Sequence, residues 1–255
     1  MGRVLLAGES WISHATHFKG FDSFSSVTFH SGADAFIAAA AEQGIGVEQM
    51  YAHDVPQRFP RTEEELAEYD VIILSDIGAN SFVLPPETWL SGQRAANPLL
   101  ALADWTRRGG GLMMAGGYLS FQGFQGFQAR ANFARSAIAP VLPVRMLDCD
   151  DRAEVPQGAP CRVTSADHPI ARAWRGESPD LLGYNVVTAR PEADVVAVVA
   201  DDVLIATWGV EQGRSLVWTS DIGPHWCPEE FLAWDGFASL VGGMLRWLGA
   251  DGNSR

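Results

Sequence analysis

GGGLMMAGGYLSFQG, residues Gly109–Gly123, predicts a buried strand that runs into a glycine-rich turn. A short apolar run between glycines is typical of a strand covered on both faces of a sheet. Gly116 and Gly117 permit backbone angles and close approaches that a side chain would prevent. Sharp turns at the carboxyl ends of central strands are where open α/β sheets build their sites and where nucleophile elbows lie. Tyr118 is the residue expected at the tip of this elbow.

The composition fits one large α/β domain spanning residues 1–255, since 47% of the residues are hydrophobic. A formal net charge of −13 argues against nucleic acid and anionic membranes as partners. The three cysteines form no disulfide framework and no C-x-x-C pair, which indicates a reducing compartment. Because the sequence also lacks a signal peptide and a membrane-spanning apolar run, we expect a soluble, cytoplasmic protein.

Strands and helices alternate through the first half of the sequence, which predicts a parallel, doubly wound sheet. Thr62 and Glu65 have the spacing of a capping box at a helix start. Residues 11–31, rich in Phe, His and Ser, are expected to form an irregular loop. The expected strands are 3–7, 47–51, 71–76 and 111–115, and the expected helices are 33–43, one starting at 62, 98–108 and 128–139.

The second half is expected to differ in character. The pattern weakens between residues 141 and 182, which indicates a less regular insertion or accessory segment. Strands follow, with residues 211–213 as a hairpin-type turn. The expected strands are 184–188, 195–200, 203–208 and 215–219, and a closing amphipathic helix is expected at 231–248.

Two segments resemble class I glutamine amidotransferases, in which a central strand runs into G-x-C-x-G-x-Q and a later strand delivers a His followed by Pro and Glu. The elbow matches this spacing at Gly116 and Gln122. Near the end of the chain, GPHWCPE at residues 223–229 makes His225 resemble the catalytic His of the family. Glu229 or the adjacent Glu230 resembles the acid that orients it.

Further segments resemble an uncharacterised, cytoplasmic branch of glutamine-amidotransferase-like proteins. They are GESW at residues 8–11 with the following histidines, YDVIILSDIGAN at 69–80 and SDIGPHW at 220–226. The resemblance covers nearly the whole chain. It implies a flavodoxin-like three-layer α/β sandwich with a mostly parallel central sheet and extra antiparallel strands in the C-terminal third.

Tyr118 stands where that family carries its nucleophilic Cys. Glutamine hydrolysis in the family needs a thiolate, with His as acid and base and backbone N–H groups for the oxyanion. A phenol with a pKa near 10 is a poor substitute at neutral pH. Ser120, the nearest hydroxyl, lies past the turn, and Cys227 is best explained as a small buried hydrophobe. Glutaminase activity by the family mechanism is therefore not expected.

Ligand contacts are expected at the carboxyl ends of the strands. Glu9, Ser10 and Trp11 offer a carboxylate, a hydroxyl and an indole for a polar, flat or sugar-like ligand, or the carboxylate caps its own turn. Gly78 offers backbone donors, or belongs to a simple strand-to-loop turn. The expected contacts are Glu9, Ser10, Trp11, Asp76, Gly78, Asn80, Gly117, Ser120, Gln122, Asp221 and Trp226, around the catalytic candidates Tyr118, His225 and Glu229.

A metal site is a further possibility, although no cofactor is firmly implied. His14 and His17 would lie on one side of a helix and, with His30, Asp76 or Asp221, could bind a divalent metal such as zinc. The alternative is that both pack their polar edges within an aromatic-rich loop. The many aromatic residues also suggest self-association into a homo-oligomer.

Two hypotheses on function follow from these residues. The first is a non-catalytic, pseudoenzyme-like domain that binds a small polar metabolite or serves in assembly, favoured by the absent Cys. The second is a non-thiol hydrolase or lyase, with or without the assistance of a metal, favoured by the density of ionisable residues at the strand ends. Its expected acid/base is His225, with Tyr118 as proton donor and Glu9 and Asp221 as orienting groups.

Overall fold

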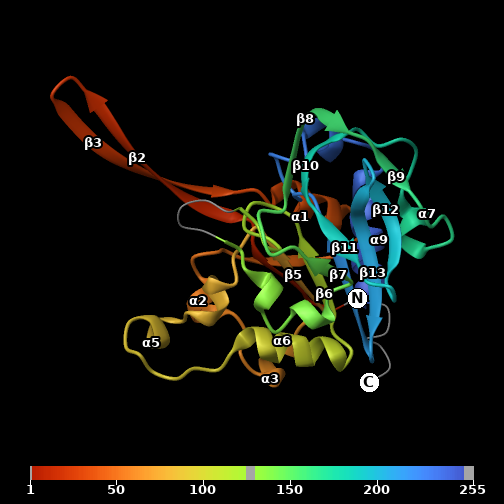
Figure 1. Cartoon of the computed structure of the whole chain (residues 1–255), viewed down its shortest axis with the longest axis horizontal. Helices are drawn as coiled ribbons and strands as arrows, with labels where there is room; N and C mark the ends of the chain where they lie inside the picture. Colours follow the sequence, from red (N-terminus) through yellow and green to blue (C-terminus); the bar gives the residue numbers. More distant parts are fainter. Residues whose placement is uncertain (1, 125–129, 250–255) are drawn as a thin grey trace.

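The computed structural model describes residues 2–124 and 130–249. Figure 1 shows an α/β body from which a long two-stranded arm projects. The body is built on an eight-stranded sheet with the order β4-β1-β5-β6-β14-β13-β12-β9. Its strands are β1 Val4–Gly8, β4 Val47–Met50, β5 Val71–Ser75, β6 Gly111–Ala115, β9 Cys161–Val163, β12 Asp194–Val199, β13 Asp202–Val210 and β14 Gly213–Trp218.

The parallel half of the sheet is flavodoxin-like. Strands β4, β1, β5, β6 and β14 run parallel to their neighbours, and numbering these five along the chain gives the order 2-1-3-4-5. Strands β13, β12 and β9 then extend the sheet antiparallel. The expected combination of a parallel core with antiparallel strands in the C-terminal part is confirmed.

Helices cover both faces of this sheet. In β1, Val4 and Leu6 pack on one face while Leu5 and Ala7 pack on the other, as strand alternation requires. The predicted capping box of Thr62 with Glu65 is present at the start of α3. The helices are α1 Asp34–Glu42, α2 Val55–Arg58, α3 Glu63–Leu66, α4 Asn80–Val83, α5 Pro86–Trp89, α6 Pro98–Arg107, α7 Pro169–Ala173, α8 Glu229–Leu232 and α9 Phe237–Gly249. No helix of the described residues is long and apolar enough to cross a membrane.

Within residues 2–124 and 130–249, three two-stranded sheets lie outside the central one. They are β2 Ser10–Lys19 with β3 Asp22–Ser31, β8 Arg152–Ala159 with β10 Leu181–Asn185, and β7 Val144–Met146 with β11 Val187–Ala189. Residues 141–182 are therefore more regular than expected, and β9 within them joins the central sheet.

The expectation of an irregular loop at residues 11–31 is wrong, because β2 and β3 form a hairpin there. All ten residues of β2 pair with β3, from Ser10 opposite Ser31 to Lys19 opposite Asp22. Gly20, with φ of 65°, permits the tight turn between them. The segment contains five aromatic residues, and aromatic residues favour strands even without a clear apolar alternation.

Other expected elements are shorter or interrupted. The helix expected at 128–139 is wrong over its described part: residues 130–139 contain only 3₁₀ turns at Phe133–Arg135 and at the start of Ala139–Val141, and residues 128 and 129 lie outside the described residues. Backbone groups in this stretch bond to distant partners instead, since the Phe133 N–H donates to the Phe121 carbonyl. The single closing helix is two helices, α8 and α9, separated by residues 233–236. The strand expected at 184–188 is interrupted at residue 186, whose N–H donates to the Asp151 carbonyl.

Candidate functional site

A cavity of ≈ 520 Å³ opens at the carboxyl ends of the parallel strands β1, β5, β6 and β14. This edge of an open α/β sheet, beside the point where strand order reverses, is the general position of ligand sites in such folds. Side chains from the four strand ends therefore converge on one space. The lining residues are Glu9, Trp11, Asp76, Tyr118, Leu119, Phe124, Asp221, Pro224 and His225.

The elbow after β6 depends on its two glycines. A Cβ on Gly116 would lie 2.1 Å from the Thr219 carbonyl oxygen, which no residue but glycine allows. Gly117 has φ of 134°, and a Cβ there would lie 2.8 Å from both Asp76 Oδ1 and Asp221 Oδ1. The close approach expected from the sequence is thus present, and it brings two carboxylates to either side of one backbone position.

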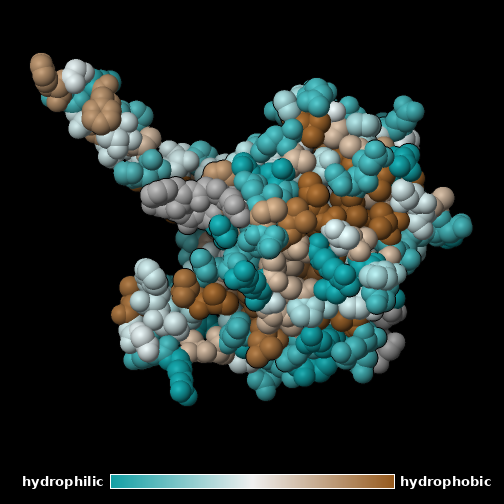
Figure 2. Space-filling view, viewed as in Figure 1, coloured by the Kyte–Doolittle hydropathy of each residue, from teal (hydrophilic) through white to brown (hydrophobic). Residues whose placement is uncertain are grey.

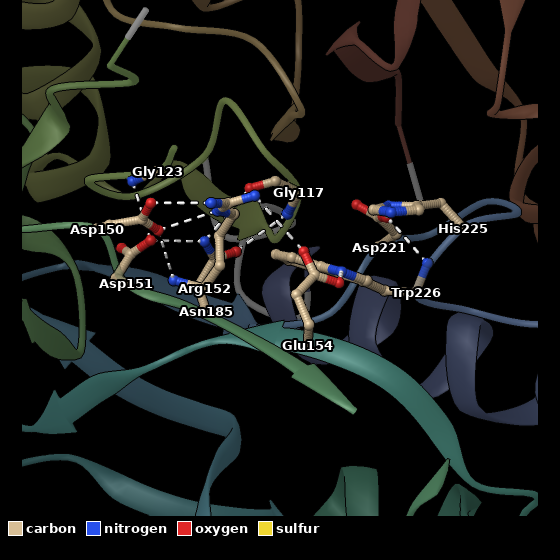
Figure 3. Close-up of polar contacts among 10 residues, drawn as sticks. All are labelled: Gly117, Gly123, Asp150, Asp151, Arg152, Glu154, Asn185, Asp221, His225 and Trp226. Atoms are coloured by element: carbon tan, nitrogen blue, oxygen red, sulfur yellow. Dashed lines mark hydrogen bonds and ion pairs between the residues drawn. The ribbon is translucent and has the colours of Figure 1, made fainter. Parts of the chain in front are cut away.

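Asp221 and His225 form a carboxylate–imidazole pair after β14. His225 Nδ1 lies 3.0 Å from Asp221 Oδ2, and the Trp226 N–H donates to the same oxygen at 3.2 Å (Figure 3). Asp221 is buried, whereas the His225 side chain is 45% exposed. The hydrogen bond to Asp221 raises the pKa of His225 above its usual value. Because Asp221 holds Nδ1, Nε2 is the nitrogen that His225 can offer to a ligand.

Glu9 and Asp76 place two more carboxylates at the cavity. Both have a left-handed backbone, with φ of 48° and 40°, which is costly for residues other than glycine and is found at functional sites. Ser75 Oγ donates to Glu9 Oε2 at 2.6 Å, and the Leu119 N–H donates to Asp76 Oδ1 at 2.7 Å. Burial, together with the neighbouring Asp221 charge, raises the pKa of Asp76 to about 6 and that of Glu9 well above its usual range.

Tyr118 lies at the mouth of the cavity, 36% exposed, among aromatic rings and one guanidinium. Its ring meets the His225 ring edge to face, stacks on Phe124 at 5.9 Å and has Arg152 Cζ 4.9 Å from its centroid. Burial and then the nearby Glu154 carboxylate raise the pKa of the phenol. Tyr118 is therefore protonated at neutral pH and can donate a hydrogen bond, but it is not a ready nucleophile.

Buried polar side chains from the β8 and β10 segments form hydrogen bonds to the backbone of the elbow (Figure 3). The Gln122 and Gly123 N–H groups both donate to the Asp151 carboxylate at 2.9 Å. Asn185 Nδ2 donates to the same carboxylate, while Asn185 Oδ1 accepts the Gly117 N–H at 3.0 Å. Neither acid nor amide was expected from the sequence, although both fix the backbone that carries Tyr118.

Several expected contact residues are not among the residues that line the cavity. Ser10 Oγ accepts the Ala52 N–H, and Ser120 Oγ accepts the Asp76 N–H, so both position backbone. Trp226 is buried, and its Nε1–H donates to Glu154 Oε2 at 3.0 Å. Gly78 is buried beside residue 131, and Asn80 is exposed at the start of α4. Gln122 is buried, and its Oε1 has no hydrogen-bond partner among the described residues.

The remaining candidates do not have the positions that were expected from the sequence. Glu229 is exposed in the first turn of α8, and the acid that contacts His225 is Asp221 instead. His14 and His17 lie on β2 of the arm, where residues three apart point to opposite faces rather than to one side of a helix. His17 Nε2 pairs with Ser26 Oγ at 2.9 Å. Among the described residues no group of three or more His, Cys, Asp or Glu side chains is arranged to hold a metal ion.

Comparison with known proteins gives one family over almost the whole chain. The model of the GATase1_like family, described as "Putative glutamine amidotransferase", matches residues 3–250. No curated protein sequence matches the chain.

Two solved structures are similar to the chain from end to end. "Cytoplasmic Protein STM3548 from Salmonella typhimurium" has 39% sequence identity and a TM-score of 0.90, covering 96% of this chain and 98% of its own. "Cytoplasmic Protein STM1381 from Salmonella typhimurium LT2" has 41% identity and a TM-score of 0.90, covering 96% and 99%. The structure described as "a Putative thua-like protein from Bacteroides uniformis ATCC 8492" shares the fold alone, with 11% identity and a TM-score of 0.56 over 97% of this chain and 91% of its own.

Proposed function

Because the chain belongs to this glutamine amidotransferase-like family, we propose that it binds a small polar metabolite in the elbow cavity without performing thiol-dependent glutamine hydrolysis. The observation that carries the proposal is the convergence of Tyr118, His225 and three carboxylates on one cavity of ≈ 520 Å³. That volume is in the range of small-molecule sites, about 300–1,000 Å³. The names of the two Salmonella proteins support a cytoplasmic location for this chain as part of the same proposal.

The chemistry of the lining supports the non-thiol part of this proposal. No cysteine is among the lining residues of the described chain, and Tyr118 occupies the elbow. Cys227 is buried, and burial raises the pKa of its thiol well above the usual value, which makes it unreactive. Glutamine therefore meets a protonated phenol at the elbow and no nucleophilic thiolate.

The polarity of the lining indicates which metabolites fit. Glu9, Asp76 and Asp221 supply acceptor oxygens, whereas no Lys or Arg lines the cavity within the described residues. Trp11, Tyr118 and other rings supply flat apolar walls. Hydroxyl- or amine-bearing ligands complement this lining, and strongly anionic ligands do not.

A second candidate function is favoured by the His225–Asp221 pair. A histidine held by a buried carboxylate and facing a cavity is the arrangement of a general acid/base in hydrolases and lyases. In this alternative Tyr118 donates a hydrogen bond or proton to the substrate, and His225 Nε2 moves the second proton. Turnover of the bound metabolite, with loss of turnover in His225→Ala, would favour this candidate over binding alone.

The test is calorimetric titration of the full chain with a panel of polyols, primary amines, amino acids and glutamine. We expect at least one hydroxyl- or amine-bearing compound to bind the wild type, and His225→Ala to abolish that binding. Asn80→Ala is the matched control, because Asn80 is exposed at the start of α4 and does not line the cavity. Equal loss in both variants, or ammonia release from glutamine by the wild type, would contradict the proposal.

A further inference from the structure

The β2–β3 arm is a sheet without a partner. Its two strands pair only with each other, so each leaves an unpaired outer edge within the described residues. Ten residues at ~3.3 Å per residue give the arm a length of about 33 Å from its base at Ser10 to the turn (Figure 1). An isolated two-stranded hairpin is only marginally stable in water, and open strand edges readily take on another strand.

Large apolar side chains are exposed along this arm. Phe21 at the turn and Phe18 beside it are 111% and 78% exposed, and Val27 is 67% exposed. Figure 2 shows apolar side chains at the far end of the arm, separated from the body by polar surface. Proteins rarely expose apolar side chains in such density unless another surface covers them.

The charge distribution favours a second copy of this chain as the surface that packs on these side chains. Residues 10–31 contain one cation, Lys19, and one anion, Asp22, so the arm has no net formal charge while the chain as a whole has −13. Two bodies repel each other, but two arms do not. A contact between copies is therefore least costly along the arm.

The base of the arm belongs to the cavity. Trp11, the second residue of β2, lines the cavity and stacks on His30 of β3 with ring centroids 5.0 Å apart. Two arms of equal length that lie side by side and antiparallel place the tip of each at the base of the other. The tip carries Lys19, which is the only lysine in the sequence, and the base adjoins the carboxylates of the cavity.

We propose that two copies of the chain associate through their arms, antiparallel about a two-fold axis, so that Lys19 of each copy lies at the acidic rim of the cavity of the other. The accessible carboxylate of that rim is Glu154, which is exposed beside Tyr118. Isologous two-fold contacts of this kind are the commonest form of self-association. The inference needs no ligand and so stands apart from the proposed function.

The first experiment measures the mass of the full chain by sedimentation equilibrium at micromolar concentration. We expect the wild type to have twice the chain mass. A shortened arm, in which Asn-Gly replaces residues 14–27 and joins the paired Ser13 and Thr28, should be monomeric because it keeps Trp11 and His30 but not the tip. Phe18→Ser with Val27→Ser, which leaves the hairpin complete, should also be monomeric.

A control variant tests whether the contact between copies is confined to the arm. Trp89→Ser with Leu90→Ser removes side chains 70% and 76% exposed on the body and should leave the dimer intact. A monomeric wild type would overturn the proposal and would indicate that the arm binds a different protein. A shortened-arm variant that remains dimeric would overturn it in favour of a contact between bodies.

The second experiment locates Lys19. A carbodiimide joins an amine to a carboxylate that it touches, and Lys19 is the only lysine available. In a mixture of ¹⁵N-labelled and unlabelled copies, we expect mixed-label peptides that join Lys19 to Glu154, and Lys19→Ala should abolish them. Mixed-label links from Lys19 to carboxylates far from the cavity would overturn the antiparallel arrangement, while leaving the metabolite titration unaffected.

Discussion

Tyr118 and His225 meet edge to face, with ring centroids 4.7 Å apart and ring planes at 87°. They follow β6 and β14, and both line the same cavity. Such a ring pair contributes about 0.5–1.5 kcal/mol beyond the burial of its area. The contact thus uses the Tyr118 ring to support His225, while the phenol hydroxyl lies beside the Glu154 and Arg152 side chains.

Tyr118→Phe separates these two contributions. It keeps the ring contacts, so we expect the free energy of unfolding to change by less than about 1 kcal/mol. It removes a hydrogen bond worth about 0.5–1.5 kcal/mol to a bound ligand, so affinity in calorimetry should fall about 2- to 12-fold. Tyr51→Phe, outside the cavity, is the control, and an equal effect in both variants would show that Tyr118 does not contact the ligand.

The His225–Asp221 pair predicts a pH-dependent stability. Because the folded state raises the pKa of His225, the stabilisation is complete below about 6.5, the ordinary imidazole value, and is lost as pH rises through the raised value. The difference in Tm between wild type and His225→Gln should therefore be larger at roughly pH 5.5 than at pH 9. Nearly half of the side chain is exposed, so solvent screening keeps the effect small. In an Asp221→Asn background the same difference should depend less on pH, because the largest cause of the raised pKa is removed.

Asp76 also makes stability fall as pH rises, in this case because the folded state disfavours its charged form. Its pKa of about 6 lies above the ordinary value, so folding favours the protonated acid and stability falls as pH rises from about 4 through 6. Asp76→Asn removes that charge and keeps an acceptor oxygen for the Leu119 N–H. We expect denaturant unfolding to show a gain of about 1–3 kcal/mol at roughly pH 8 and none near pH 4. A gain of equal size at both pH values would contradict the assignment.

The strand ends and the elbow could be predicted because their signals are local. Short apolar runs closed by Gly8, Asp76 or Gly116 mark buried strands and their carboxyl ends, and parallel strands bring those ends to one edge. Asp221 as the partner of His225 could not be predicted in the same way. Its position depends on how the intervening turn folds back, including a φ of 151° at His225 that only the finished structure fixes.

The arm and the network of Asp151 and Asn185 could not be predicted from local sequence patterns. In residues 10–31, Ser, Thr, His and Phe occur on both faces of the hairpin, so the apolar alternation that identifies a strand is absent. Asp151 and Asn185 meet through the pairing of β8 with β10, and strand register of this kind has no signature in a single sequence.

Asp151 provides the last prediction, because its burial and its three donors make the elbow dependent on one carboxylate. Asp151→Ala leaves the Gln122 and Gly123 N–H groups and Asn185 Nδ2 without their acceptor in a buried setting. Each buried donor left unpaired costs about 1–3 kcal/mol, and partial relaxation should hold the loss in free energy of unfolding to about 2–4 kcal/mol. Asp148→Ala, at an exposed position three residues earlier, should change it by less than about 0.5 kcal/mol. Because Asn185 also accepts the Gly117 N–H, the Asp151 variant should lose metabolite binding together with stability, and full affinity in a destabilised variant would show that the network does not position the elbow.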